Sequence, residues 1–165
     1  METEELLDWV DENDQVIGEV ERSVANSDPK YIHREVGILI HDAKGRVLVQ
    51  RRSFKKKTDP GVWIMSVAGH VKSGVSPEQT AHEELREELG FDTDLKFIEK
   101  SLEKHSNETI FAYMYVGLYN GEPIIFDEDE TEAVMFLDKD EFSRLCKNET
   151  VEEISKDYFL RYFKR

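Results

Sequence analysis

The segment of residues 69–91, GHVKSGVSPEQTAHEELREELGF, constrains the fold more than any other part of the chain. Ser76 is a typical N-cap residue, and Pro77 suits the first position of a helix. Gln79 completes a capping box, and Gly90 provides a stop signal at the other end. The spacing of these residues therefore predicts a helix that begins after Ser76 and ends before Gly90.

One side of this helix is strongly acidic. Glu84, Glu87 and Glu88 stand at positions i, i+3 and i+4, so that Glu84 is a neighbour of both others. Another side is apolar, because residues at four-residue spacing line up along a helix. This apolar stripe consists of Ala81, Leu85 and Leu89. We therefore expect the helix to pack on a core while it presents three carboxylates beside one another.

Carboxylates in this arrangement repel one another, so they require a cation nearby. Mg²⁺ or Mn²⁺ prefers carboxylate oxygens and completes its coordination with water and substrate phosphate. The alternative is a solvated acidic face whose charge is offset by Arg86 and Lys72, which is how most charge runs behave. On the residues of the helix alone, both interpretations stay open.

Apolar, often β-branched runs elsewhere in the chain predict strands separated by short polar connections. Runs 6–10 and 15–22 flank the turn sequence DEND and predict an N-terminal hairpin, which with a polar connection covers residues 1–30. Runs 35–42 and 46–52 predict adjacent strands joined by a short turn. Further strands are predicted at 62–69, 95–104, 109–119 and 132–138, and helices at 139–147 and 151–164. The pattern indicates a layered α/β (α+β) fold with a mixed sheet.

Length and charge limit the classes of protein to consider. A chain of 165 residues suits one domain, residues 1–165, with a sizeable core. Lys and Arg total 22 against 36 Asp and Glu, and the net charge is −14. Duplex nucleic acid is therefore not the expected partner, because phosphate backbones bind to basic surfaces. A small anion held through a metal or a local basic pocket is compatible with this charge.

The chain has one cysteine, Cys146, which excludes an intrachain disulfide, a cysteine-based zinc site and a cysteine-pair redox motif. The acidic N-terminus has no basic flank before an apolar core, and no apolar run is long enough to cross a bilayer. We expect a soluble, cytoplasmic protein without a membrane partner. A homodimer is an arrangement that the sequence leaves open.

Segment 69–91 resembles the Nudix box, whose pattern is Gly, five residues, Glu, seven residues, then Arg-Glu-aliphatic-any-Glu-Glu-any-Gly-aliphatic. The matching positions are Gly69, Glu84, Leu85, Glu87, Glu88, Gly90 and Phe91. Two positions depart from the pattern, since its first Glu is Val75 and its Arg is Glu83. The resemblance implies the Nudix α/β/α sandwich, in which the box forms a loop, helix, loop unit that binds divalent metal beside a diphosphate.

The resemblance covers most of the chain. WVDENDQVIGEVERS and YIHREVGILIHDAKGRVLVQRRSFKKKTDPGVWIMSVAGHV look like the Nudix branch that includes type I isopentenyl-diphosphate isomerase and its hydrolase-like relatives. The isomerases use a cysteine where this chain has Ala68, and alanine cannot donate or accept a proton. His33 and His70 match two histidines of their metal cage, Asn26 replaces a third, and Glu108 is a loose match for an acidic position. Both histidines are equally well explained as structural residues that bridge backbone and carboxylate groups.

The resemblance thus implies hydrolysis of a nucleoside diphosphate derivative or a related diphosphate, with Mg²⁺ or Mn²⁺ as the cofactor. Glu84, Glu87 and Glu88 are the predicted metal ligands and catalytic residues, and the metal assists attack of water on phosphorus. The sequence does not identify the carboxylate that takes the proton of this water. The candidates are Glu87, Glu88, Glu108, Glu130 and Glu132.

A basic segment, QRRSFKKKTDPGVW, follows the run at 46–52 in an otherwise acidic chain. Such residues bind a second phosphate by charge and, through arginine, by paired hydrogen bonds, although a solvated loop is an equal alternative. The predicted substrate-binding residues are Arg51, Arg52, Lys55, Gly69 and His70.

Two other functions compete with hydrolysis. One is an isopentenyl-diphosphate isomerase that works with a different acid, which Ala68 and Asn26 disfavour. The other is a catalytically weak Nudix domain that binds a nucleotide or a protein, which Val75 and Glu83 favour. The small-molecule diphosphate, most simply a nucleotide, is the expected partner in the preferred interpretation.

Overall fold

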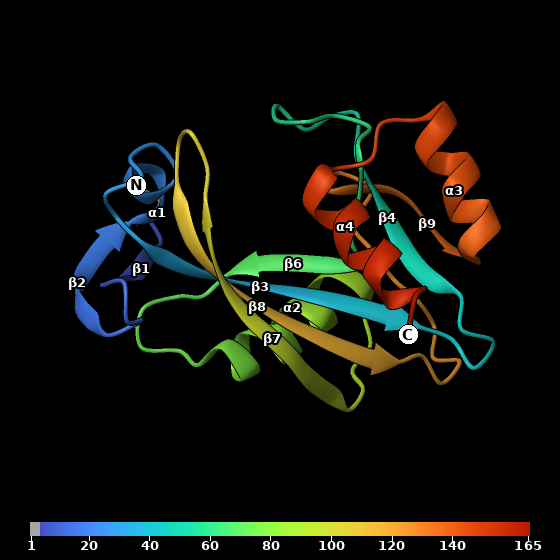
Figure 1. The fold of residues 1–165 in the computed structure, drawn as a ribbon, viewed down its shortest axis with the longest axis horizontal. Helices are drawn as coiled ribbons and strands as arrows, with labels where there is room; N and C mark the ends of the chain where they lie inside the picture. The colour runs from blue at the N-terminus through green and yellow to red at the C-terminus, as the bar shows by residue number, and fades with distance from the viewer. Residues whose placement is uncertain (1–3) are drawn as a thin grey trace.

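A computed structural model of the protein describes residues 4–165 (Figure 1). The N-terminal part forms the predicted hairpin, in which β1 (Leu6–Val10) and β2 (Val16–Glu21) make a two-stranded antiparallel sheet. The Asp11 carboxylate accepts the backbone N–H groups of Asn13 and Gln15, as expected for an Asp in a tight turn. A short helix, α1 (Arg22–Ala25), follows and was not predicted. The first three residues of the predicted 1–30 segment lie outside the described residues.

A mixed, seven-stranded sheet forms the centre of the fold. Its strands are β3 (His33–His41), β4 (Val47–Arg52), β5 (Trp63–Ile64), β6 (Val67–His70), β7 (Leu95–Lys104), β8 (Thr109–Leu118) and β9 (Thr131–Leu137). The order is β5-β4-β3-β8-β7, with β6 paired to β3 and β9 paired to β4. The β3–β8 pair is parallel, and the other pairs are antiparallel.

Three helices cover the two faces of this sheet (Figure 1). α2 (Pro77–Leu89) lies on one face, and α3 (Lys139–Asn148) and α4 (Glu153–Tyr162) lie on the other. The predicted apolar stripe of α2 is buried in one core, together with strand residues such as Ile38 and Leu48. Phe142 and Phe159 anchor α3 and α4 in a second core on the other face. The predicted α/β/α sandwich is thereby confirmed.

The ends of α2 also lie where the sequence predicts them. The Ser76 hydroxyl accepts the N–H of Gln79 at 3.1 Å, and Gly90 adopts φ 77° while its N–H bonds the carbonyl of Arg86. Only half of the predicted capping box is present. The Gln79 side chain does not accept the backbone N–H of Ser76, and its amide instead donates to Glu83, one turn further along the helix, at 2.8 Å.

The predicted strands 35–42 and 46–52 are confirmed as the neighbours β3 and β4, joined by a short turn, but their pairing is brief. β3 and β4 pair only at His41 and Val47, and beyond that point β6 pairs with β3 while β9 pairs with β4. The predicted single strand at 62–69 is likewise divided into β5 and β6. Ser66 lies at the division, where its buried hydroxyl accepts the N–H of Ile40 at 2.8 Å and donates to the carbonyl of Leu48 at 2.6 Å. One hydroxyl therefore satisfies a donor of β3 and an acceptor of β4 where these strands no longer satisfy each other.

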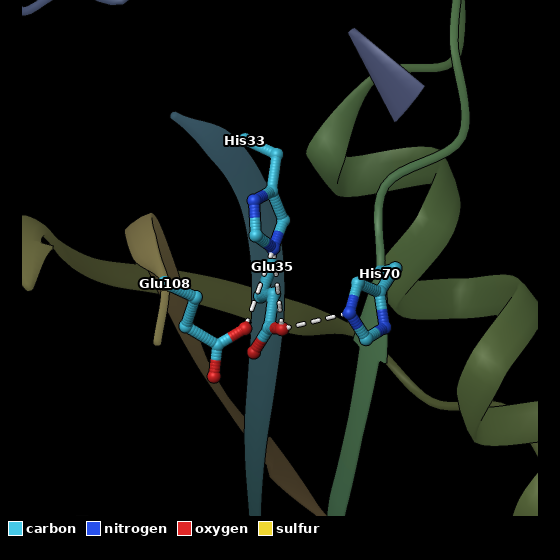
Figure 2. A group of neighbouring side chains, drawn as sticks. All are labelled: His33, Glu35, His70 and Glu108. Atoms are coloured by element: carbon cyan, nitrogen blue, oxygen red, sulfur yellow. Dashed lines mark ion pairs between the residues drawn. The ribbon is translucent and has the colours of Figure 1, made fainter. Parts of the chain in front are cut away.

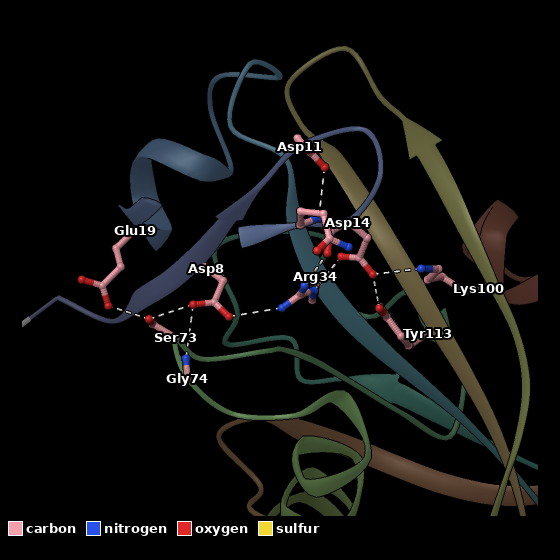
Figure 3. Close-up of polar contacts among 10 residues, drawn as sticks. Asp8, Asp11, Asp14, Glu19, Arg34, Ser73, Gly74, Lys100 and Tyr113 are labelled. Carbon is pink, nitrogen blue, oxygen red and sulfur yellow. Dashed lines mark hydrogen bonds and ion pairs between the residues drawn. The ribbon is translucent and has the colours of Figure 1, made fainter. Parts of the chain in front are cut away.

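Arg34 of β3 ties the hairpin to the sheet (Figure 3). Its side chain donates to Asp14 at 2.7 Å and to Asp8 at 3.2 Å. Lys100 of β7 and the hydroxyl of Tyr113 of β8 bond the other oxygen of Asp14. The Asp8 carboxylate also accepts Ser73 and Gly74 from the loop before α2 (Figure 3).

Within residues 4–165, no helix combines the length and the apolar character needed to span a bilayer. The organisation of residues 1–165 as one domain stays a prediction.

The bonds of Ser66 predict a large loss of stability when its hydroxyl is removed. Ser66→Ala leaves a buried N–H at Ile40 and a buried carbonyl at Leu48 without their partner, which lowers the free energy of unfolding by about 2–4 kcal/mol. Urea denaturation measures the loss. Ser143→Ala is the control, because Ser143 bonds only the Lys139 carbonyl on the exposed side of α3. Equal effects of the two substitutions would contradict the role of Ser66.

Candidate functional site

A cavity of about 850 Å³ lies against α2 and the strands β3 to β6. Its wall contains seven of the residues that the sequence predicted for the site or as candidate bases. They are Arg52, Gly69, His70, Glu84, Glu87, Glu88 and Glu130. The N-terminal part of the chain adds Glu5 and Arg22. The Nudix-like segment and the hairpin thus share one cavity.

Glu84 lies directly against the backbone of Gly69. A Cβ atom at Gly69 would be 2.3 Å from the carboxyl carbon of Glu84, so that no side chain fits at position 69 without displacing Glu84. Burial and then the charge of Glu87 raise the pKa of Glu84 to about 7. This close packing explains why a glycine precedes an acidic helix at this spacing.

Glu88 is held by a residue that sequence reasoning missed. The side-chain amide of Gln50 on β4 donates to the Glu88 carboxylate at 2.9 Å and to the Ser66 carbonyl at 3.0 Å. The hydroxyl of Thr131 donates to the Gln50 carbonyl oxygen at 2.9 Å, which fixes the orientation of the amide. Burial nonetheless raises the pKa of Glu88 to about 7. No local pattern pointed to Gln50, because its partners come from β9 and α2.

Arg86 and Lys72, the two cations that could have offset the negative charge of the acidic helix, do so only in part. Arg86 forms an ion pair with Asp92, away from the box glutamates. Lys72 lies 3.5 Å from Glu5 and lowers the pKa of Glu84, although burial and Glu87 outweigh this effect. Glu83, which replaces the arginine of the box pattern, is bonded to Gln79. The carboxylates of Glu84 and Glu88 therefore keep an unfavourable charge that a divalent cation fits.

A second group of metal-ligand side chains lies beside them (Figure 2). One ligand atom from each of His33, Glu35, His70 and Glu108 lies within 4.8 Å of the others. His33 is fully buried, and its Nδ1 lies 3.2 Å from the Tyr31 carbonyl. If Nδ1 donates there, Nε2 carries the lone pair.

This Nε2 atom is buried without a hydrogen-bond partner and lies 3.7 Å from Glu35 and 3.8 Å from Glu108. His70 Nε2 lies 3.0 Å from both Glu35 and Asn26. Burial lowers the pKa of His70, which favours the neutral, metal-binding form. A lone pair that faces two carboxylates fits a cation, and imidazole with carboxylate suits Mn²⁺, Fe²⁺ or Zn²⁺.

The residues predicted to bind substrate separate into two groups. Arg52, Gly69 and His70 line the cavity. Arg51 forms an ion pair with Glu149 at 2.9 Å, and its guanidinium lies over the rings of Phe54 and Trp63. Lys55 pairs with Asp129. Neither Arg51 nor Lys55 lines the cavity, and their role in substrate binding stays a prediction.

The candidate bases also differ in position. Glu130 lines the cavity but pairs with Lys56. Glu108 belongs to the histidine cluster, and Glu132 lies on β9 outside the cavity wall. Glu152, which sequence reasoning did not consider, does line the cavity.

Comparison with protein families matches residues 31–162 to the NUDIX domain. Isopentenyl-diphosphate Delta-isomerase of Serratia proteamaculans is 33% identical over 125 residues, which are 73% of this chain and 69% of the relative. An uncharacterized Nudix hydrolase of Listeria monocytogenes is 26% identical over 142 residues, 86% of this chain and 84% of the relative. The crystal structure of DR0079 from Deinococcus radiodurans matches with a TM-score of 0.80 at 22% identity, covering 96% of this chain and 99% of that one.

The contacts of Gln50 predict that it controls metal affinity through Glu88. Gln50→Leu removes the donor that holds Glu88, so we expect Mn²⁺ binding, measured by calorimetry, to weaken by about 10–100-fold. Thr131→Val leaves the Gln50 amide free to rotate and should weaken binding less. Thr131→Ser keeps the hydroxyl and is the matched control. Unchanged affinity in Gln50→Leu would contradict a role of the Gln50–Glu88 contact in metal binding.

The raised pKa values predict a pH dependence in metal-free protein. Glu84 and Glu88 keep their protons up to about pH 7 in the folded state, against 4.5 for an ordinary glutamate. The folded state therefore binds more protons between these values, and stability falls as the pH rises from about 5 to 8. In EDTA, the melting temperature should fall over this range, and Glu88→Gln should reduce the fall. A melting temperature that rises with pH over this range would contradict the raised pKa values of Glu84 and Glu88.

Proposed function

Because the chain belongs to the Nudix family, we propose that it is a divalent-metal-dependent pyrophosphohydrolase that cleaves the diphosphate bond of a nucleoside diphosphate derivative. The observation that carries the proposal is the gathering of Glu84 and Glu88 in one cavity, where both pKa values are raised to about 7. Carboxylates forced together in this way are suited to share a cation. Ala68 lines the same cavity and has no group that transfers a proton.

The residues that match the box pattern, and Gln50 beside them, have physical roles in this proposal. Glu84, Glu87 and Glu88 hold Mg²⁺ or Mn²⁺, Gly69 leaves room for Glu84, and Gln50 orients Glu88. A bound divalent cation neutralises phosphate charge, polarises a phosphorus–oxygen bond and lowers the pKa of water. Residues of the cavity wall then bind and orient the remaining charge of the substrate.

Three cationic side chains in the cavity wall are suited to bind phosphate oxygens. They are Arg22, Arg52 and Lys72. The Arg52 side chain also donates to the Thr58 carbonyl at 2.8 Å and 3.1 Å, which holds its guanidinium in place. A guanidinium held in this way binds a phosphate with less loss of side-chain entropy than a free one. Glu87 and Glu130 remain candidates for accepting the proton of the attacking water.

The histidine cluster supports a second candidate function. His33, Glu35, His70 and Glu108 offer a metal site apart from the box glutamates, and curated relatives are named isopentenyl-diphosphate isomerases. An isomerase must add a proton to one carbon and remove one from another. Ala68, where the resembling isomerases have cysteine, leaves this pair of groups incomplete, so that hydrolysis remains the preferred function.

The first test is a panel of nucleoside diphosphates and triphosphates, nucleotide sugars, dinucleotides and isopentenyl diphosphate, with Mg²⁺ or Mn²⁺ and chromatography of the products. Metal-dependent release of a phosphate or a nucleoside monophosphate supports hydrolysis. Migration of the double bond in isopentenyl diphosphate supports the isomerase. Metal binding without turnover supports a binding module and contradicts the proposal.

Glu87→Gln and Glu83→Gln provide a matched pair on one helix. Glu87→Gln removes charge from an exposed position that faces the cavity, so we expect the fold to stay intact and activity to fall at least about 100-fold. Glu83 is bonded to Gln79, and its substitution should change activity less than about threefold. Turnover is measured on the best substrate of the panel, and folding by circular dichroism. Full activity in Glu87→Gln would refute the site.

A further inference from the structure

The segment between α3 and α4 brings Glu152 to the cavity wall. The backbone N–H of Trp63, on β5, donates to the backbone carbonyl of Thr150 at 3.0 Å. The backbone N–H of Glu152 donates in turn to the backbone carbonyl of Trp63 at 2.9 Å. Trp63 and Val151 form a parallel bridge, so that the segment continues the sheet beside β5. The backbone at Glu152 is therefore fixed by strand-like bonds, and the residue lines the cavity.

The carboxylate of Glu152 is also held in place. Ser155 is fully buried in the first turn of α4, where its hydroxyl accepts the N–H of Met65 at 2.8 Å and donates to the Glu152 carboxylate. This contact engages one carboxylate oxygen, Oε2, and within residues 4–165 no side chain bonds the other oxygen, Oε1. Burial raises the pKa of Glu152, the Ser155 bond lowers it, and the charge of Glu35 raises it further.

Glu152 differs in its partner from several other carboxylates of the cavity. Glu5 pairs with Arg22 and Lys72, Glu35 lies against His70, and Glu130 pairs with Lys56. Within residues 4–165, Glu152 forms no ion pair, and the hydrogen-bond partner of its side chain is the neutral hydroxyl of Ser155. Among the described residues, the positive charge of Arg52 lowers the pKa of Glu152 without a direct contact, so that the carboxylate keeps an acceptor oxygen that is not engaged in an ion pair.

Apolar side chains share this wall with Glu152. They are Val62, Ile64, Ala68 and Val151. None of these side chains offers a hydrogen bond, so the non-phosphate part of a bound diphosphate depends on the polar groups of the wall for its hydrogen bonds. Among these groups, the Glu152 carboxylate is an acceptor that Ser155 holds in place. A substrate without donors would cover the carboxylate and remove its hydration without replacing it, which is costly for a charged group.

We propose that Glu152 is a specificity-determining residue, which accepts a hydrogen bond from a hydroxyl or amino group on the non-phosphate part of the substrate. The inference rests on the proposed function and names its substrate class: diphosphates that carry a sugar or a nucleoside, rather than an isoprenoid chain. A site that hydrogen-bonds a substrate group discriminates strongly against analogues that lack it.

The test compares wild type, Glu152→Gln and Glu152→Leu, with ADP-ribose and isopentenyl diphosphate as probes. Affinity is measured by calorimetry with Ca²⁺ in place of Mg²⁺, and turnover is measured separately with Mg²⁺. We expect Glu152→Leu to weaken ADP-ribose binding by about 10–100-fold, as for a lost hydrogen bond to a charged group, and to strengthen isopentenyl diphosphate binding. Glu152→Gln keeps an acceptor oxygen, so its affinity for each probe should lie between those of the wild type and Glu152→Leu. Glu12→Leu, at an exposed position in the turn between β1 and β2 and outside the cavity wall, is the control for the loss of an acidic residue.

The ratio of the two affinities decides the inference. The inference is overturned if Glu152→Leu changes the affinities for both probes equally or leaves both unchanged. It is also overturned if the wild type does not bind ADP-ribose more tightly than isopentenyl diphosphate. A wild type that cleaves either probe while the ratio stays unchanged would overturn the inference and retain the proposed function. A changed ratio without any cleavage would retain the inference about recognition and contradict hydrolysis.

Discussion

The hydroxyl of Ser66 is the contact on which the arrangement of the sheet depends. It bonds β3 through Ile40 and β4 through Leu48, at the level where these two strands separate. The separation lets β6 pair with β3, which places Gly69 at the end of β6 and against Glu84. The Ser66 carbonyl also accepts Gln50, the residue that holds Glu88. The positions of two predicted metal ligands therefore follow from the way in which the sheet opens.

Local signals in the sequence were sufficient for most of the elements but not for the extent of strand pairing. Ser76 and Gly90 mark the ends of α2 correctly, because caps depend on neighbouring residues. The separation of β3 from β4 was missed, because it depends on a hydroxyl contributed by a distant segment. The same reason explains which residues of the site could be predicted from the sequence. Glu84 and Glu88 are identified by spacing, whereas Gln50 and Glu152 reach the cavity only through contacts between segments far apart in the chain.

The distribution of charge in the cavity gives the net charge of −14 a structural meaning. Acidic groups at the rim have basic partners, such as Lys56 for Glu130 and Arg22 for Glu5. Glu84 and Glu88 are instead partly or largely buried, and burial and neighbouring carboxylates raise their pKa values to about 7, although Lys72, Arg22 and Arg52 act in the opposite direction. Such a pattern separates acidic residues that keep the surface soluble from those that carry an electrostatic strain, which a cation would relieve.

The bonds of Arg34 have a consequence for the kinetics of recognition. They join the hairpin, the central sheet and the loop before α2 through a few buried side chains, so that the hairpin cannot fray without breaking contacts in all three. The hairpin and α1 supply Glu5 and Arg22 to the cavity rim. A rim anchored in this way is preorganised, and a ligand that enters it loses little conformational entropy of the protein on arrival. Association would then be governed by the approach and orientation of the ligand rather than by closure of a flexible arm.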